Sequence, residues 1–179
     1  MSNLQNSLEA LKLALKTEEE GYRLYSTGAE QSKNELVKSI FIQLFKDELM
    51  HIDLIKRFYA HLNDSESWAS MTNDERNYKG LKGEFRTIFS TYLEKIGQGK
   101  ESFSENDLEV YQKAIEFEKN GVAMYSQLFN ESGDENAKKF YTFLRDMEQE
   151  HADVLDNTYQ YLKNPDSWYL NQEGWTMDY

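Results

Sequence analysis

The chain has 179 residues, enough for one domain with a substantial hydrophobic core, and a formal charge of −12 that argues against nucleic acid or an anionic membrane surface as a partner. It contains no cysteine, which excludes disulfides, iron–sulfur clusters, cysteine-ligated iron and thiol catalysis, so any bound metal must be held by oxygen and nitrogen. No stretch is apolar enough to span a bilayer and the N-terminus lacks the layout of a signal peptide, so we expect a cytoplasmic protein.

The composition, with a single proline and many Leu, Glu and Lys residues, favours an all-α fold. We expect a first helical hairpin over residues 4–62, in which one helix ends near Gln31 and the next begins near Asn34, a suitable N-cap. Because the turn between these helices is short, they should be antiparallel neighbours. Glycines and an Asn-Asp-Ser turn punctuate residues 63–104, and we expect a crossover that packs along the bundle, with a short helix over Phe85–Ile96.

A second hairpin is expected over residues 105–163. Its first helix starts near Ser104, which opens a capping-box pattern, and its second helix follows Gly133 and ends before Pro165. The two hairpins and the crossover should make a four-helix bundle, with the whole chain as a single domain.

The C-terminal tail, residues 164–179, is too aromatic to be left in solvent. Its aromatic residues are Trp168, Tyr169, Trp175 and Tyr179. Together with Trp68, the tail indicates a buried self-association surface or a clamp across the bundle.

The centres of the second and fourth predicted helices carry the same motif, Glu-x-x-His. Each motif interrupts an apolar seam that advances in alternating steps of four and three residues, and it occupies places where leucine is expected. Residues three apart share a helix face, so Glu48 and His51 should both point into the core. The same holds for Glu148 and His151. An unpaired buried carboxylate is costly, so something must neutralise it, and a metal ion is the obvious candidate.

The two hairpins are an internal repeat. Six residues recur at an offset of 100 positions: Glu18, Gly21, Tyr25, Glu48, His51 and Trp68 return as Glu118, Gly121, Tyr125, Glu148, His151 and Trp168. Such a tandem repeat of helical hairpins should fold as a bundle with a pseudo-twofold axis. We expect the metal pair to lie on that axis.

The first and third bundle helices have seams with the same steps, which run through Glu18, Tyr22 and Tyr25 and through Glu118, Val122 and Tyr125. Together the four seams place six candidate metal ligands near the middle of the helices: Glu18, Glu48, His51, Glu118, Glu148 and His151. One glutamate from each of two helices and Glu-x-x-His from the other two is the ligand set of a di-iron or di-manganese carboxylate centre. A single Glu-x-x-His is weak evidence, because most such motifs lie on a solvated face, but two in register with two further glutamates are specific. The four carboxylates balance two divalent cations, and they suit iron or manganese, with zinc possible and copper disfavoured.

Two further pairs of residues lie close to the candidate ligands. Tyr25 and Tyr125 each sit two helical turns beyond a seam glutamate, as core aromatics or as hydrogen-bond donors to a ligand carboxylate of the facing helix. Glycine inside a helix costs about 1 kcal/mol relative to alanine, so the presence of Gly21 and Gly121 calls for a reason. Either a close helix crossing or space for a bound oxygen species would explain them.

Four aspartates beside the motifs are candidates for hydrogen bonds to the histidines, although we expect most to be solvated: Asp47, Asp53, Asp146 and Asp153.

The chain resembles the rubrerythrin branch of the ferritin-like superfamily. The resemblance covers residues 8–62 and 105–163 and rests on Glu18 with Tyr25, Glu48-Leu49-Met50-His51, Glu118 with Tyr125, and Glu148-Gln149-Glu150-His151. It implies a ferritin-like antiparallel four-helix bundle with a long connection between the second and third bundle helices, and an iron site that reacts with peroxide or O2. It also implies that Glu48 and Glu148 bridge the metals, that the other four ligands are terminal, and, with the aromatic tail, that the protein is a homodimer.

Two departures from the rubrerythrin pattern bear on function. Classical rubrerythrins carry a cysteine-rich rubredoxin domain that feeds electrons to the site, whereas this chain has no cysteine and would need an external electron donor. They also carry an extra glutamate one turn from the ligand on the third bundle helix, which exchanges with a histidine on redox change. Ile115 and Gly121 occupy the positions three before and three after Glu118 here, so the family's peroxidase cycle does not simply transfer.

Three functions are compatible with such a site. The first is an oxidoreductase of the oxidative-stress type, in which two iron ions support oxidation of Fe(II) and reduction of hydrogen peroxide or O2. The second is a bundle that binds or sequesters iron, or another divalent metal, without turnover. The third is a structural bundle in which metal only holds the helices together, so that chelation would collapse its stability.

Overall fold

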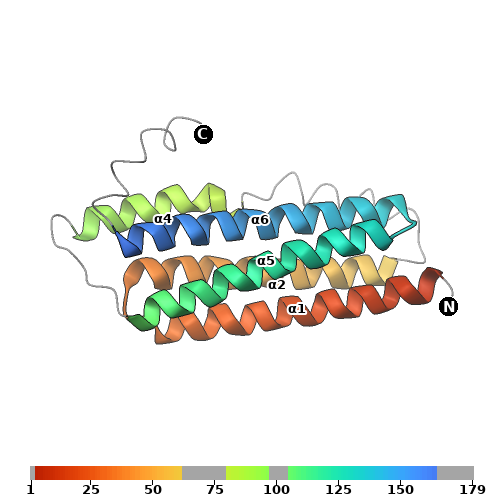
Figure 1. The fold of residues 1–179 in the computed structure, drawn as a ribbon, viewed down its shortest axis with the longest axis horizontal. Helices are drawn as coiled ribbons and strands as arrows, with labels where there is room; N and C mark the ends of the chain where they lie inside the picture. The colour runs from red at the N-terminus through yellow and green to blue at the C-terminus, as the bar shows by residue number, and fades with distance from the viewer. Residues whose placement is uncertain (1–2, 62–79, 97–104, 165–179) are drawn as a thin grey trace.

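A computed structural model describes residues 3–61, 80–96 and 105–164 of the chain. These ranges contain five α-helices and no strand: α1 (Asn3–Gln31), α2 (Glu35–His61), α4 (Gly80–Ile96), α5 (Glu105–Glu131) and α6 (Glu135–Lys163). The expected all-α fold built from two helical hairpins is confirmed (Figure 1). Trp68, most of the crossover and residues 165–179 of the aromatic tail lie outside the described residues.

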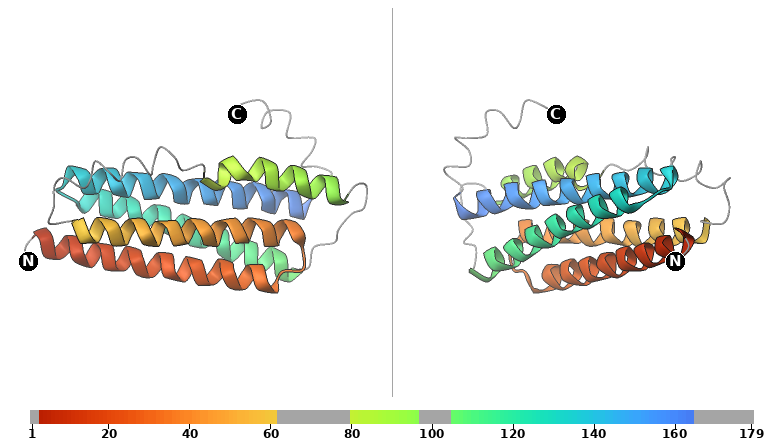
Figure 2. Two further views of the ribbon diagram at one scale, coloured as in Figure 1. Left: turned by 180° about the vertical axis from the view of Figure 1, so that it is seen from behind. Right: turned by 45° about the vertical axis from the view of Figure 1, so that its right-hand side comes forward.

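The four long helices run side by side as two hairpins, and the crossover helix lies along them (Figures 1 and 2). α1 packs on α2 and α5 packs on α6, while α1 also contacts α5. α4 contacts both α2 and α6, so this helix of the crossover packs along the bundle as expected. Within the described ranges, no helix combines the length and the apolar character that a membrane crossing requires.

Both hairpin turns end in the same kind of helix cap. The side-chain oxygen of Asn34 accepts hydrogen bonds from the backbone N–H groups of Leu36 and Val37, both at 3.0 Å, which confirms Asn34 as the cap of α2. Asp134 holds the equivalent place before α6, where its carboxylate accepts a bond of 2.7 Å from Ala137 N. The chain therefore reverses at equivalent points in the two repeats, which keeps the hairpins in the same register.

Two hydrophobic clusters form the core, one toward each end of the bundle. The first contains Phe41 and Tyr111, whose rings stack with centroids 5.2 Å apart. The second contains Phe58 and Phe140, whose rings stack at 4.4 Å. Because the first cluster draws on residues near the α1–α2 turn and the second on residues at the opposite ends of these helices, the middle of the bundle is left to polar side chains.

The buried faces of α1 and α5 depart from the predicted seam at their centres. Gly21 and Gly121 are buried, whereas Tyr22 and Val122, which the alternating steps placed in the seam, are half-buried. The buried face turns toward the glycines because a carboxylate of the paired helix packs against each of them, Glu48 against Gly21 and Glu148 against Gly121.

Helix α4 begins at Gly80, earlier than the predicted start at Phe85. Its first turn is stabilised from α6, where the carboxylate of Glu150 accepts a hydrogen bond of 2.6 Å from Lys82 N, a favourable place for a negative charge. Farther along, Phe89 packs edge-on against Tyr161 with ring centroids 4.9 Å apart. The crossover helix therefore extends the first hydrophobic cluster.

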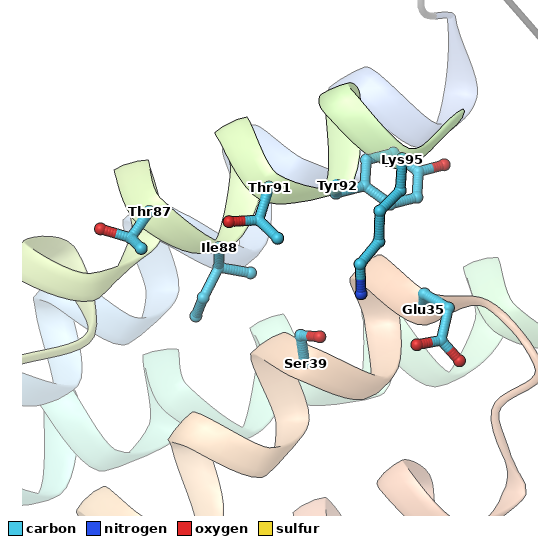
Figure 3. A pocket seen from close by; sticks show the side chains of 7 residues that line it. All are labelled: Glu35, Ser39, Thr87, Ile88, Thr91, Tyr92 and Lys95. Carbon is cyan, nitrogen blue, oxygen red and sulfur yellow. The ribbon is translucent and has the colours of Figure 1, made fainter. Parts of the chain in front are cut away.

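A surface pocket lies between α2 and α4 (Figure 3). The residues that line it are Glu35, Ser39, Thr87, Ile88, Thr91, Tyr92 and Lys95. None of the six predicted ligands lines this pocket, since they lie in the interior of the bundle.

Candidate metal centre

Four helices bring the six predicted ligand residues together in the middle of the bundle. Helices α1 and α5 contribute one glutamate each, and α2 and α6 contribute the two Glu-x-x-His motifs. All six side chains are buried, with 0–2% of each exposed: Glu18, Glu48, His51, Glu118, Glu148 and His151. They project inward because each stands in a helix face that continues on both sides as apolar residues. We refer to these six residues as the carboxylate–histidine cluster.

The cluster divides into two overlapping groups that could each hold a metal ion. Glu48 and Glu148 belong to both groups. Glu18 and His51 complete the first group, and Glu118 and His151 complete the second. Within each group the potential ligand atoms lie within 4.8 Å of one another. The shared residues are the two to which the resemblance assigns the bridging role.

Both imidazoles turn the same nitrogen toward the carboxylates. His51 Nδ1 lies 2.9 Å from Glu18 Oε2 and 3.3 Å from Glu148 Oε1. His151 Nδ1 lies 3.5 Å from Glu118 Oε2. The two rings stack with centroids 5.5 Å apart and planes 17° apart. Nδ1 is therefore the nitrogen available to a metal ion in each half, and Nε2 faces away from the cluster.

Each half of the cluster is also held by a tyrosine from the other hairpin. The hydroxyl of Tyr25 donates a hydrogen bond to Glu118 Oε1, and the hydroxyl of Tyr125 donates one to Glu18 Oε1. Both rings are fully buried. The tyrosines thus combine the two alternatives that the sequence offered, since they are core aromatics whose hydroxyls fix the carboxylate of a facing helix.

Gly21 and Gly121 leave room for the two shared carboxylates. A Cβ atom on Gly21 would lie 3.0 Å from Glu48 Cδ and 2.9 Å from Phe117 Cε1. A Cβ atom on Gly121 would lie 3.1 Å from Glu148 Oε2. The sequence left a close helix crossing and space for an oxygen species as explanations; in the structure the space beside each glycine holds a glutamate side chain.

Of the four aspartates beside the motifs, Asp47 approaches a histidine. Its Oδ2 lies 3.4 Å from His151 Nε2, and its side chain is buried. The other three are exposed and pair elsewhere: Asp53 with Arg57 at 2.8 Å, Asp146 with Arg145 at 2.7 Å, and Asp153 with Gln149 at 2.8 Å.

Sequence reasoning missed Gln43, which donates a hydrogen bond of 2.9 Å from Nε2 to Asp47 Oδ1. The signal that could have found it is a difference within the repeat. Phe143 and Met147 replace Gln43 and Asp47 at the offset of 100. A polar pair on the inner part of one helix, matched by an apolar pair on its copy, indicates a polar contact that one half makes and the other lacks.

Burial and neighbouring charges divide the four glutamates into two kinds. Burial raises a carboxyl pKa, but the charge of His51 and hydrogen bonds from neighbours outweigh it and lower the pKa of Glu18 to about 2. The pKa of Glu118 is also lowered against the effect of burial, chiefly by a hydrogen bond with Glu148. Burial, followed by the charge of nearby glutamates, raises the pKa of Glu48 and Glu148 well above the usual value.

The imidazoles and tyrosines respond to the same carboxylates. Burial opposes a charged imidazole, but the glutamate charges outweigh it and raise the pKa of His51 well above its usual value and the pKa of His151 to about 10. Burial, and then the glutamate charges, raise the pKa of Tyr25 and Tyr125, so both phenols keep their protons. Without metal, protons on the two imidazoles and the two shared carboxyls leave the cluster close to neutral.

The donor set fits a pair of divalent metal ions. Several buried atoms on the inner side of the cluster have no hydrogen-bond partner among the described residues: Glu48 Oε1 and Oε2, Glu118 Oε2, Glu148 Oε1 and His151 Nδ1. The outer nitrogens, His51 Nε2 and His151 Nε2, have none either. Buried polar atoms without partners are costly, and coordination to cations would satisfy those on the inner side. Two divalent cations would also balance the four carboxylates after the protons leave. Carboxylate oxygens with one imidazole per ion suit iron or manganese.

Comparison with protein families gives a match over residues 9–159 to the family described as rubrerythrin. The matched segment contains all six residues of the cluster and both tyrosines. Comparison with curated proteins and with solved structures gives no match. The family match and the helical architecture agree on a ferritin-like bundle with a buried carboxylate–histidine cluster.

Proposed function

Because the chain belongs to the rubrerythrin family, we propose that it is a di-iron carboxylate oxidoreductase. In this proposal it oxidises Fe(II) and reduces hydrogen peroxide or O2, and an external donor returns the electrons. The supporting observation is the pair of buried ligand groups that share Glu48 and Glu148. Two ions held there would share these carboxylates, and together they would supply Lewis acidity and electrons to an oxidant.

In this role each group of the cluster holds one iron ion. Glu18 and His51 serve one ion, Glu118 and His151 serve the other, and the shared glutamates serve both. Bound iron supplies the electrons and the Lewis acidity that reduction of peroxide or O2 requires. The carboxylates favour the more positive, oxidised state of the pair, because opposite charges attract strongly where water is excluded.

The surrounding side chains orient the ligands and exclude water. Tyr25 and Tyr125 each fix one oxygen of a terminal glutamate, which leaves the other carboxylate oxygen directed to the cluster. Since the pKa of both phenols is raised, they remain donors over the physiological pH range. The two hydrophobic clusters close the bundle on either side of the site.

The test starts from protein loaded anaerobically with about two equivalents of Fe(II) per chain. Hydrogen peroxide should oxidise the iron, seen as a rise in near-ultraviolet absorbance, and repeated additions with a reductant should show catalytic loss of peroxide. Glu148→Ala should abolish both signals. Glu20→Ala removes an exposed carboxylate that pairs with Lys16, and it should change neither signal.

Three outcomes would refute the enzyme proposal. Consumption of peroxide only in proportion to the bound iron would identify a sequestering protein. Binding of zinc that is inert to peroxide, with unfolding on chelation, would identify a structural bundle. Failure to bind any divalent metal would remove the basis of the proposal.

A further inference from the structure

The two halves of the metal centre differ behind their histidines. Both rings turn Nδ1 toward the carboxylates, so Nε2 is the nitrogen that faces away from the cluster. His151 Nε2 lies at ion-pair distance, 3.4 Å, from Asp47 Oδ2, which belongs to the other hairpin. Neither Nε2 atom makes a hydrogen bond within the described part of the chain, but the carboxylates that approach His51, at 2.9–3.6 Å, all lie on its Nδ1 side, so no carboxylate stands behind that ring.

Asp47 is itself held in place. Gln43, one turn earlier on α2, donates to Asp47 Oδ1 at 2.9 Å, which leaves Oδ2 for His151. The aspartate is 4% exposed, so its charge is little screened by water. The equivalent positions on α6 hold Phe143 and Met147, so no carboxylate occupies the place that corresponds to Asp47.

This difference affects how well each imidazole can bind a metal ion. A carboxylate that accepts the outer N–H of a ligating histidine fixes its tautomer, orients the ring and raises the basicity of the ligating nitrogen. The thioether of Met147 is only a weak acceptor and carries no charge. The metal position at Glu118 and His151 therefore has a carboxylate behind its imidazole, which the position at Glu18 and His51 lacks.

We propose that the two metal positions are unequal, and that the position at Glu118 and His151 takes up a divalent ion first and more tightly. Asp47 is the positioning residue, because it acts through His151 and does not face the ligand atoms. The inference rests on the metal site of the proposed function but not on its redox activity. Its consequence is a defined order of filling, so that limiting metal occupies one position before the other.

Titration of the metal-free protein with Mn(II) tests this order, with free Mn(II) followed by electron paramagnetic resonance and binding heat by calorimetry. The wild type should show two steps separated by about ten- to hundredfold in affinity, the range over which a partner of a ligating histidine affects metal binding. His51→Ala should retain the tight step. His151→Ala should retain only a weak one.

Exchanges between the repeats isolate the role of Asp47. Asp47→Met gives the first hairpin the residue of the second, and it should weaken the tight step by about ten- to hundredfold while leaving the weak step unchanged. Asp47→Asn keeps an acceptor oxygen without the charge, so the affinity of its tight step should lie between those of the wild type and Asp47→Met. The reciprocal Met147→Asp should strengthen the weak step. Asp53→Asn, at an exposed aspartate of the same helix, should change neither step.

The outcomes separate this inference from the proposed function. Equal Mn(II) affinities at the two steps in the wild type would refute the proposal that the positions are unequal. Equal weakening of both steps in Asp47→Met would refute it too. Neither result would contradict the metal site itself. No Mn(II) binding at all would overturn both. If circular dichroism shows that Asp47→Met does not fold, Asp47→Asn and Met147→Asp decide the question.

Discussion

The two hairpins place the same kinds of residue around the metal centre but support them differently. In each half a glutamate, a Glu-x-x-His motif, a tyrosine and a glycine face the centre, at positions 100 residues apart. Behind that set the halves diverge, as Asp47 in the first corresponds to Met147 in the second. The residues that face the centre are therefore of the same kinds in both halves, whereas the side chains behind them differ.

The halves also differ where α1 meets α5. Phe117 fills the space beside Gly21 and packs edge-on against Tyr25, with ring centroids 6.3 Å apart. Its counterpart Thr17 is smaller, and its hydroxyl lies 3.1 Å from the carbonyl oxygen of Leu13 and 3.4 Å from Met124 Sδ. One half is therefore closed by an aromatic ring and the other by a threonine and a methionine.

Removal of a shared carboxylate should have a larger effect than removal of a terminal one. Glu148→Ala deletes a ligand of both groups, so no metal should survive dialysis, whereas Glu18→Ala should leave about one ion per chain in the other group. Elemental analysis after reconstitution measures this, with Glu20→Ala as the exposed control. Two ions retained by Glu148→Ala would show that this carboxylate is not shared.

Metal binding should be strongly pH-dependent, with both halves contributing. Four groups have a raised pKa in the metal-free protein: His51, His151, Glu48 and Glu148. A raised pKa keeps the proton bound until the pH rises through it, and a ligand must lose that proton, so affinity should rise with pH and fall toward pH 6. Calorimetry in buffers of different ionisation heat should count up to about four protons released per metal pair. Fewer than two would contradict the protonation pattern.

The two tyrosines should matter equally. Tyr25→Phe and Tyr125→Phe each remove a hydrogen bond from a buried carboxylate of the other hairpin, which should lower the unfolding free energy of the metal-free protein by about 1.5–3 kcal/mol. Denaturant unfolding at neutral pH measures the loss. Unequal losses would show that the asymmetry behind the histidines extends to the tyrosines, and no loss would mean that the hydroxyls do not support the cluster.

A smaller loss of stability is expected at Gly28, which has Leu128 as its counterpart. A Cβ atom there would lie 2.5 and 2.6 Å from two ring atoms of Phe41, which is fully buried and stacked on Tyr111. The overpacking should cost about 1–3 kcal/mol, offset by roughly 1 kcal/mol of helix propensity. Gly28→Ala should therefore unfold at lower urea concentration with unchanged Mn(II) affinity, and a more stable variant would contradict this packing.

The glycines beside the cluster should show the smallest stability effects together with altered metal binding. Gly21→Ala requires both Glu48 and Phe117 to shift, whereas Gly121→Ala requires a shift of Glu148 by a few tenths of an ångström. The first variant should therefore lose more stability than the second. Both should weaken Mn(II) binding, because a shared carboxylate moves. Wild-type affinity in both would show that the glycines do not position these carboxylates.

Helix ends and inward-facing residues could be predicted because they follow from local patterns. Asn34 caps α2 as predicted, since a cap acts on backbone N–H groups two and three residues away. The six cluster residues were identified because Glu-x-x-His interrupts an apolar seam twice in the same register. The predicted seam was wrong at Tyr22 and Val122, where the buried face depends on which side chain of another helix packs against it.

Contacts between the hairpins could not be predicted in this way. Four aspartates lie beside the motifs at similar spacings, yet only the docking of α2 against α6 brings Asp47, and not Asp53, Asp146 or Asp153, to a histidine. The purpose of Gly21 and Gly121 was equally open, because the carboxylates that occupy the space beside them come from other helices.

The amino-acid sequence by itself determined the helices, the repeat and the residues that point inward, because helical periodicity and capping are properties of neighbouring residues. The tertiary structure alone decided which tyrosine reaches which glutamate and which histidine has a carboxylate behind it. Those pairings depend on how two similar hairpins dock, and the repeat leaves that choice open because each half presents nearly the same side chains to the other.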